Sequence, residues 1–156
     1  MPLSKLCRLI PALAVAGLLL HGCGGTGVRT DDSGARREVV GTAMRQIGTP
    51  YRWGGASPAE GFDCSGLVQY AHGSAGVRVP RVAAAQLEAA QTVGREGARP
   101  GDLVFFKVGA SDYHVGILVE PGRFVHAPRS GKEVRLSALD SSYWARHFVG
   151  AGSFLN

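Results

Sequence analysis

Cys64 is the residue whose surroundings in this sequence favour chemistry most strongly. It lies in the run GFDCSG at residues 61–66, directly before a segment with helical character. Asp63 predicts a helix start, because an aspartate there accepts hydrogen bonds from the free N–H groups of the first turn. Cys64 is then the first helical residue, where those N–H groups and the helix dipole favour a thiolate. A buried structural cysteine is the alternative, but it would more often lie in an apolar run, so we interpret Cys64 as a nucleophile.

Two histidines downstream of Cys64 are candidates for the base that a thiol needs. A thiol with a pKa of about 8.5 is only a few per cent ionised at pH 7, and histidine titrates in this range. His114 begins the apolar run 114–119 and is our candidate base. His126 lies in the next β-rich run, 123–127, and is our candidate for the group that orients the base. Side chains on neighbouring strands lie about 4.5–5.5 Å apart at Cβ, close enough for a ring-to-ring hydrogen bond. A surface histidine is the alternative at each position.

Metal and nucleic-acid chemistry are less consistent with this sequence. Cys64, His114 and His126 could form a zinc site, but their wide spacing lacks the paired ligands typical of such sites. We therefore expect no metal and no cofactor. The 17 Lys and Arg residues exceed the 12 Asp and Glu residues only modestly, and they form no basic run. Nucleic acid is accordingly not expected as a partner.

The elements that must position these residues follow from the spacing of apolar side chains. Helical periodicity comes first along the chain, and short β-rich runs separated by turns come after it. Pro121 and Gly122 predict a tight hairpin between two of these runs. This order predicts an α+β fold, an antiparallel sheet with the helices packed on one side. We expect helices over 37–47, 63–72 and 82–91, and strands over 103–106, 114–119, 123–127, 134–136 and 147–152.

The N-terminal residues predict export and attachment to a membrane. The apolar run 9–20 follows Lys5 and Arg8 and is too short for a bilayer-spanning helix, so it is typical of a secretory signal. The run LHGC at residues 20–23 resembles a bacterial lipobox, which makes Cys23 an acylation site; an ordinary cleaved signal is the alternative. We therefore expect a signal peptide over 1–22, a lipidated cysteine with a flexible tether over 23–35, and one folded domain over 36–156.

Cysteine usage agrees with this organisation. Cys7 would leave with the signal peptide and Cys23 would be acylated, so Cys64 would have no partner for a disulfide. Acyl chains would hold the protein on a membrane, each buried CH₂ contributing about 0.8 kcal/mol. By the sorting pattern known for such lipoproteins, Gly24 after the acylated cysteine implies the outer membrane, facing the periplasm.

Several motifs in this order resemble the NlpC family of papain-like cell-wall cysteine peptidases, and the resemblance covers residues 37–154. The one-domain lipoprotein layout looks most like the Spr/MepS-type murein endopeptidases. The loop 56–60 is one residue longer than in that subgroup, a departure that would alter one wall of the cleft. The motifs are YRWGG at 51–55, GFDCSG at 61–66, PGDLVFF at 100–106, HVGI at 114–117 and FVHA at 124–127.

This resemblance implies roles for further residues and a papain-like form of the α+β fold. The hydroxyl of Tyr51 would complete an oxyanion hole with the backbone N–H of Cys64, although packing after Pro50 is an equal alternative from the residues alone. Asp63 and Ser65 would line the cleft and position substrate, roles compatible with their places at the helix start.

The resemblance also implies a substrate. The chain would hydrolyse amide bonds in peptidoglycan stem peptides without a cofactor, at the D-Ala–meso-diaminopimelate cross-link. The alternative bond is D-glutamyl–meso-diaminopimelate within one stem. An alternative of another class is a non-catalytic lipoprotein that binds the wall, against which the intact set of one cysteine and two histidines argues. We expect a monomer.

Overall fold

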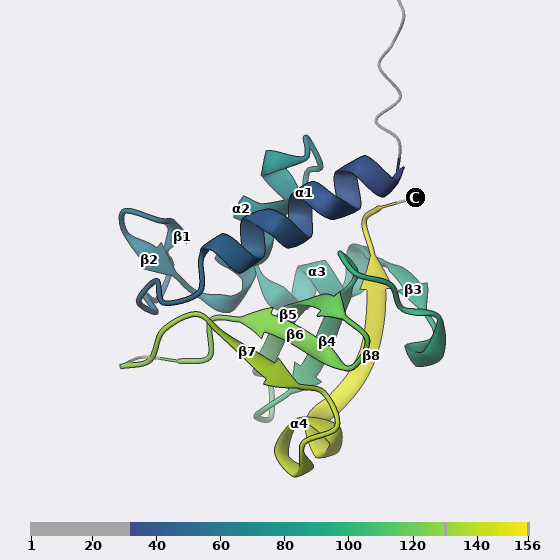
Figure 1. Cartoon of the computed structure of the whole chain (residues 1–156). Helices are drawn as coiled ribbons and strands as arrows, with labels where there is room; N and C mark the ends of the chain where they lie inside the picture. The colour runs from purple at the N-terminus through teal and green to yellow at the C-terminus, as the bar shows by residue number, and fades with distance from the viewer. Residues whose placement is uncertain (1–31, 130, 156) are drawn as a thin grey trace, which may run out of the picture.

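The computed structural model describes residues 32–129 and 131–155 (Figure 1). The predicted signal peptide, Cys23 and most of the predicted tether lie outside this part of the chain. Across the described residues, no helix is both long enough and apolar enough to cross a bilayer.

An antiparallel sheet forms the centre of the fold, as the sequence predicts. Its strand order is β3-β8-β4-β5-β6-β7, and every neighbouring pair is antiparallel. The tight turn at Pro121 and Gly122 joins β5 to β6, which confirms the predicted hairpin. The strands are β3 (Gln91–Val93), β4 (Leu103–Lys107), β5 (Tyr113–Glu120), β6 (Arg123–His126), β7 (Arg135–Ala138) and β8 (Phe148–Ser153).

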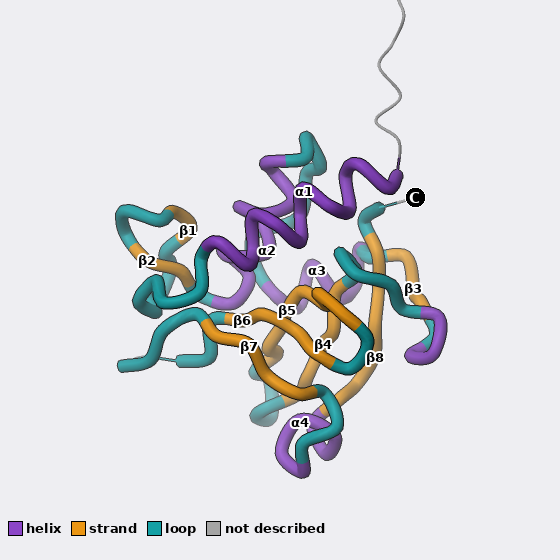
Figure 2. Tube along the Cα trace, in the orientation of Figure 1, coloured by secondary structure: helices purple, strands orange, loops and turns teal. Residues whose placement is uncertain are grey.

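The helices α1 (Asp32–Arg45), α2 (Cys64–Ser74) and α3 (Ala83–Ala89) lie on one side of this sheet (Figures 1 and 2). The main hydrophobic core fills the space between them, and it joins Val39 of α1, Leu67 of α2 and Ile117 of β5. All three side chains are fully buried, and each such side chain contributes about 1.5–3 kcal/mol. The predicted α+β class is therefore confirmed.

A further helix, α4 (Ser142–His147), packs against the second core and was not predicted. This core includes Phe106 and Phe124, against which Trp144 of α4 packs at ring distances of 4.6 and 5.4 Å. His147 consequently ends a helix, and the last strand begins at Phe148 rather than at the predicted His147. A helix of 6 residues is too short to produce a recognisable period, so local pattern could not reveal it.

The start of α1 also differs from the sequence-based prediction. Residues 32–35, expected in the tether, are helical. A buried ion pair explains this, since Arg36 donates to Asp102 at 2.8 Å and also to Asp32 one turn earlier at 3.1 Å. The long-range partner Asp102 anchors the first turn to the sheet. Other differences are the short hairpin of β1 (Ala56–Ser57) and β2 (Gly61–Phe62), the strand β3, and the 3₁₀ turn η1 (Arg95–Gly97).

Candidate active site

Asp63 caps helix α2 and thereby places Cys64 at its first position. The Asp63 backbone is extended, with φ −87° and ψ 175°, and its Oδ1 accepts from the Gly66 N–H at 2.7 Å. This confirms the predicted cap. Cys64 is half-buried and is the free cysteine of the described residues.

The loop before α2 lies directly against the helix, and glycine makes this approach possible. A Cβ on Gly66 would lie only 2.1 Å from the Gly55 carbonyl oxygen, so no larger residue fits there. The second carboxylate oxygen of Asp63 accepts from the Gly54 N–H at 3.0 Å. One side chain thus fixes both the helix start and the neighbouring loop.

Arg81 is a residue of this site that sequence reasoning missed. Its guanidinium forms a two-pronged ion pair with Asp63, at 2.8 and 3.0 Å, and also donates to the Ser65 hydroxyl at 3.0 Å. Burial favours the neutral acid, but Arg81 and the N–H groups of Gly66 and Gly54 hold the pKa of Asp63 below its ordinary value. The ion pair spans 18 residues, so no local pattern could have indicated it.

The two histidines meet on β5 and β6. His114 Nε2 lies 2.8 Å from His126 Nδ1, a hydrogen-bonding distance. Ile117 pairs with Val125, so continuing the register places His126 beside Gly116, two residues from His114. The rings therefore contact diagonally rather than directly across the strands, which is within reach of long side chains.

Ser137 extends this pair to the next strand. Its Oγ on β7 lies 2.9 Å from His126 Nε2, so both ring nitrogens of His126 have partners. Sequence reasoning missed Ser137, because only the strand pairing of β6 with β7 brings it to His126.

Aromatic side chains enclose the histidine pair and remove it from water. Trp144 stacks on His114 with ring centres 5.2 Å apart and meets the His126 ring edge-on at 4.9 Å. Burial lowers the pKa of His114 to about 4. Burial also lowers the pKa of His126, and the charges of His114 and Arg135 add to this effect. Both rings are therefore neutral near pH 7, so His114 is able to accept a proton.

The pKa of the Cys64 thiol is shifted in the direction opposite to the one that its helix-start position predicts. Burial raises the pKa of the Cys64 thiol, and the negative charge of Asp63 raises it further. The backbone N–H groups of Ser65 and Cys64 at the helix start, and that of Val115 on β5, act in the opposite direction, but burial outweighs them. The resting site therefore holds a neutral thiol beside neutral imidazoles rather than a preformed thiolate.

One cleft of about 640 Å³ brings most of the predicted site residues together: Tyr51, Asp63, Cys64, Ser65 and His114 line it. His126 lies behind His114 and is 1% exposed. Burial, followed by the charges of Cys64 and Asp63, raises the pKa of Tyr51, so its hydroxyl keeps the proton that a hydrogen-bond donor needs. Within the described residues, no group of three or more His, Cys, Asp and Glu side chains is placed to hold a metal ion.

Comparison with known protein families agrees with this geometry. A model of the NlpC/P60 family matches residues 48–153, which include the cleft, both histidines and Ser137. The chain belongs to the NlpC/P60 family. The match begins after α1, so the first helix of this NlpC/P60 protein lies outside the matched region.

Individual NlpC/P60 relatives give the same result. The chain is 46% identical to murein DD-endopeptidase MepH of Escherichia coli K12 over 123 residues, 75% of this chain and 45% of the relative. It is 42% identical to the gamma-DL-glutamyl hydrolase of Bacillus subtilis 168, over 83% of this chain and 32% of the relative. A solved Staphylococcus aureus protein of the NLP/P60 family, similar to lipoprotein, superposes with a TM-score of 0.72 at 39% identity, over 81% of this chain and 43% of that one. This chain thus spans less than half the length of these relatives.

Proposed function

We propose that this chain is a peptidoglycan endopeptidase, a cysteine peptidase that hydrolyses amide bonds of murein stem peptides. The observation that carries the proposal is Cys64 at the start of α2, in one cleft with His114, whose Nε2 is held by His126. A helix-start thiol beside an oriented imidazole is an arrangement that performs acyl transfer. The sequence relative named murein DD-endopeptidase supports the substrate class.

The proposed base role assigns the protons of the hydrogen-bonded histidines. The base role that we assign to His114 sets the direction of this hydrogen bond: for Nδ1 to take the thiol proton, Nε2 must carry the ring proton and donate it to His126 Nδ1, which lies 2.8 Å away. His126 then carries its own proton on Nε2 and donates it to Ser137 Oγ. These two hydrogen bonds hold one tautomer of His114 and keep the lone pair of its Nδ1 available for the thiol proton.

Hydrolysis then proceeds in two stages. The sulfur of Cys64 bonds to the scissile carbonyl carbon while His114 takes the thiol proton, and the oxyanion accepts from the Cys64 N–H and the Tyr51 hydroxyl. His114 returns the proton to the leaving amine, the C–N bond breaks and a thioester remains. Water, deprotonated by His114, hydrolyses the thioester and regenerates the thiol. Asp63 and Ser65 line the cleft beside the bound peptide.

The D-Ala–meso-diaminopimelate cross-link is the proposed bond. The 46% identity with a murein DD-endopeptidase supports it. A specific observation also favours the second candidate, the D-glutamyl–meso-diaminopimelate bond, since a gamma-DL-glutamyl hydrolase is 42% identical over a longer stretch. We further propose that the protein is a monomer. Acylated Cys23 would anchor it in the outer membrane, facing the periplasm, and the lipobox-like run at residues 20–23 supports this anchor.

Digestion of purified muropeptides tests this function. The full chain, purified in detergent, is incubated with cross-linked and uncross-linked muropeptides, and the products are separated and weighed by mass spectrometry. Loss of cross-linked dimers with a gain of intact monomers identifies the cross-link, whereas fragmentation of monomers identifies the stem bond. Cys64→Ser serves as the matched control and should stay folded yet lose activity by several orders of magnitude. Equal digestion by Cys64→Ser would contradict the mechanism.

A further inference from the structure

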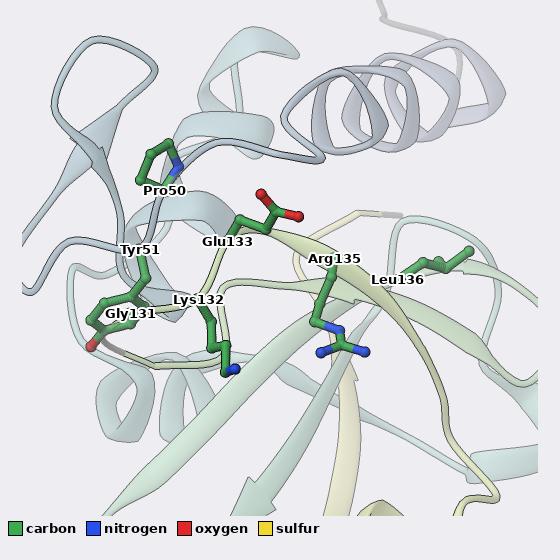
Figure 3. Close-up of a pocket in the computed structure, with 7 residues that line it drawn as sticks. All are labelled: Pro50, Tyr51, Gly131, Lys132, Glu133, Arg135 and Leu136. Atoms are coloured by element: carbon green, nitrogen blue, oxygen red, sulfur yellow. The ribbon is translucent and has the colours of Figure 1, made fainter.

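A second cavity, of about 740 Å³, lies beside the catalytic cleft (Figure 3). Tyr51 lines both the catalytic cleft and this cavity. A substrate that is bound in the cleft and passes over Tyr51 would therefore reach the second cavity. The proposed mechanism leaves this cavity unused. It is lined by Pro50, Tyr51, Gly131, Lys132, Glu133, Arg135 and Leu136.

The charged side chains of this cavity are arranged for an anion. Lys132 and Arg135 extend to the same side of the backbone, whereas the Glu133 carboxylate points to the other side (Figure 3). Both cations are exposed, and within the described residues neither is in an ion pair. Two exposed cations that line one cavity, without an ion-pair partner in the described residues, leave their N–H donors available to a ligand.

Arg135 also connects the cavity to the histidine pair. It is the cross-strand partner of His126 in the pairing of β6 with β7. Its positive charge is one of the causes that lower the pKa of His126. An anion bound to Arg135 would therefore offset a positive charge next to the histidines, which favours the imidazolium formed when His114 takes the thiol proton.

We propose that Lys132 and Arg135 form a subsite for a free carboxylate of the stem peptide, next to the scissile bond. This inference rests on the proposed function, because stem peptides supply carboxylates close to their hydrolysable bonds. A D-glutamyl residue linked through its γ-carboxyl keeps a free α-carboxylate, and meso-diaminopimelate carries a second carboxylate. The planar fork of Arg135 matches a carboxylate with two parallel hydrogen bonds, and Lys132 adds a second charge.

Paired substrates test the subsite. One fragment carries its free carboxylates, and matched fragments carry an amide at the glutamyl or at the diaminopimelyl carboxylate. The wild-type protein should cleave the free fragment with a kcat/KM about tenfold higher than one of the amidated fragments. Lys132→Gln and Arg135→Gln should each lose most of this preference, and Arg135→Lys should restore part of it. Arg78→Gln removes an exposed arginine that lines neither cavity and should change nothing. Equal losses on free and amidated fragments in Arg135→Gln would overturn the proposal.

Binding to the Cys64→Ser protein separates this inference from the proposed function. Calorimetry compares the free and amidated fragments on Cys64→Ser and on Cys64→Ser combined with Arg135→Gln. Tighter binding of the free fragment that disappears with Arg135→Gln supports the subsite, even if the wild-type chain cleaves neither fragment and the proposed function falls. Equal binding of both fragments to Cys64→Ser would overturn the subsite.

Discussion

Ser137→Ala isolates the last group of the histidine chain. The Ser137 hydroxyl lies 2.9 Å from Nε2 of His126, a residue that is 1% exposed. Its removal leaves a buried imidazole N–H without its protein acceptor, which costs about 1–3 kcal/mol. Ser137 is itself half-buried, so a water molecule is able to enter and replace part of the bond. We therefore expect a loss in the lower part of the range of about 1–3 kcal/mol. A loss of about 1.4 kcal/mol corresponds to a tenfold change in rate, so kcat should fall about tenfold.

The loss should come from the protonation pattern rather than from substrate binding. Without an acceptor at Nε2, His126 is free to carry its proton on Nδ1, which faces His114 Nε2. His114 must then move its own proton to Nδ1 and lose the lone pair that accepts from the thiol. Ser137 does not line the catalytic cleft, so KM should stay near its wild-type value.

Steady-state kinetics of Ser137→Ala and Ser137→Thr between pH 5 and 9 tests this reasoning. Threonine keeps the hydroxyl and suits a strand, so Ser137→Thr should retain most of the activity. Nitrogen-15 chemical shifts of the imidazoles should report a mixed tautomer of His126 in the alanine variant alone. Full kcat in Ser137→Ala, or an equal loss in both variants, would refute the assigned direction of the hydrogen bonds.

Three further predictions follow from the site, the fold and the N-terminal sequence. His114→Ala should be nearly inactive and His126→Ala less impaired, because base and orienting group contribute unequally; kcat/KM in the reverse order would exchange their roles. Cys23→Ala should abolish incorporation of a fatty-acid probe and change membrane fractionation, and persistent labelling would rule out the anchor. Burial lowers the pKa of His72 to about 4, against about 6.5 when unfolded. The unfolded chain therefore binds the extra proton between these values, and stability is lost as pH falls through this window. Urea unfolding measures the free energy of unfolding at pH 7 and at pH 4.5. Between these pH values, His72→Leu should lose about 2–3 kcal/mol less of this free energy than the wild type does. Equal losses in the two proteins would contradict the lowered pKa of His72.

Local sequence signals predicted the elements that position the nucleophile and the base. The Asp63 cap acts within a single turn, so the start of α2 at Cys64 could be predicted from residues 61–66. The apolar runs of β4 and β5 and the turn at Pro121 and Gly122 are equally local. These local features are sufficient to predict that His114 and His126 lie on adjacent strands.

Long-range contacts account for what the sequence did not reveal. Arg81 meets Asp63 across 18 residues and Ser137 meets His126 across 11, and in both cases the contact depends on the completed packing. Trp144 lies on a helix too short for periodicity, and its role against the histidines depends on how α4 folds back on the sheet. The diagonal register of His114 and His126 likewise follows from the observed strand pairing.

The pKa of the Cys64 thiol likewise depends on contacts that the local sequence does not show. The cap that positions Cys64 also places the Asp63 carboxylate beside the sulfur, where its charge raises the pKa of the thiol. Arg81 pairs with that carboxylate at 2.8 Å, and the charge of Cys64 is among the causes that raise the pKa of Arg81. Burial decides the balance, and it keeps both the thiol and His114 neutral at rest. In the proposed mechanism, the thiolate and the imidazolium are then formed together when the proton moves from Cys64 to His114, and each stabilises the other at the time the sulfur attacks.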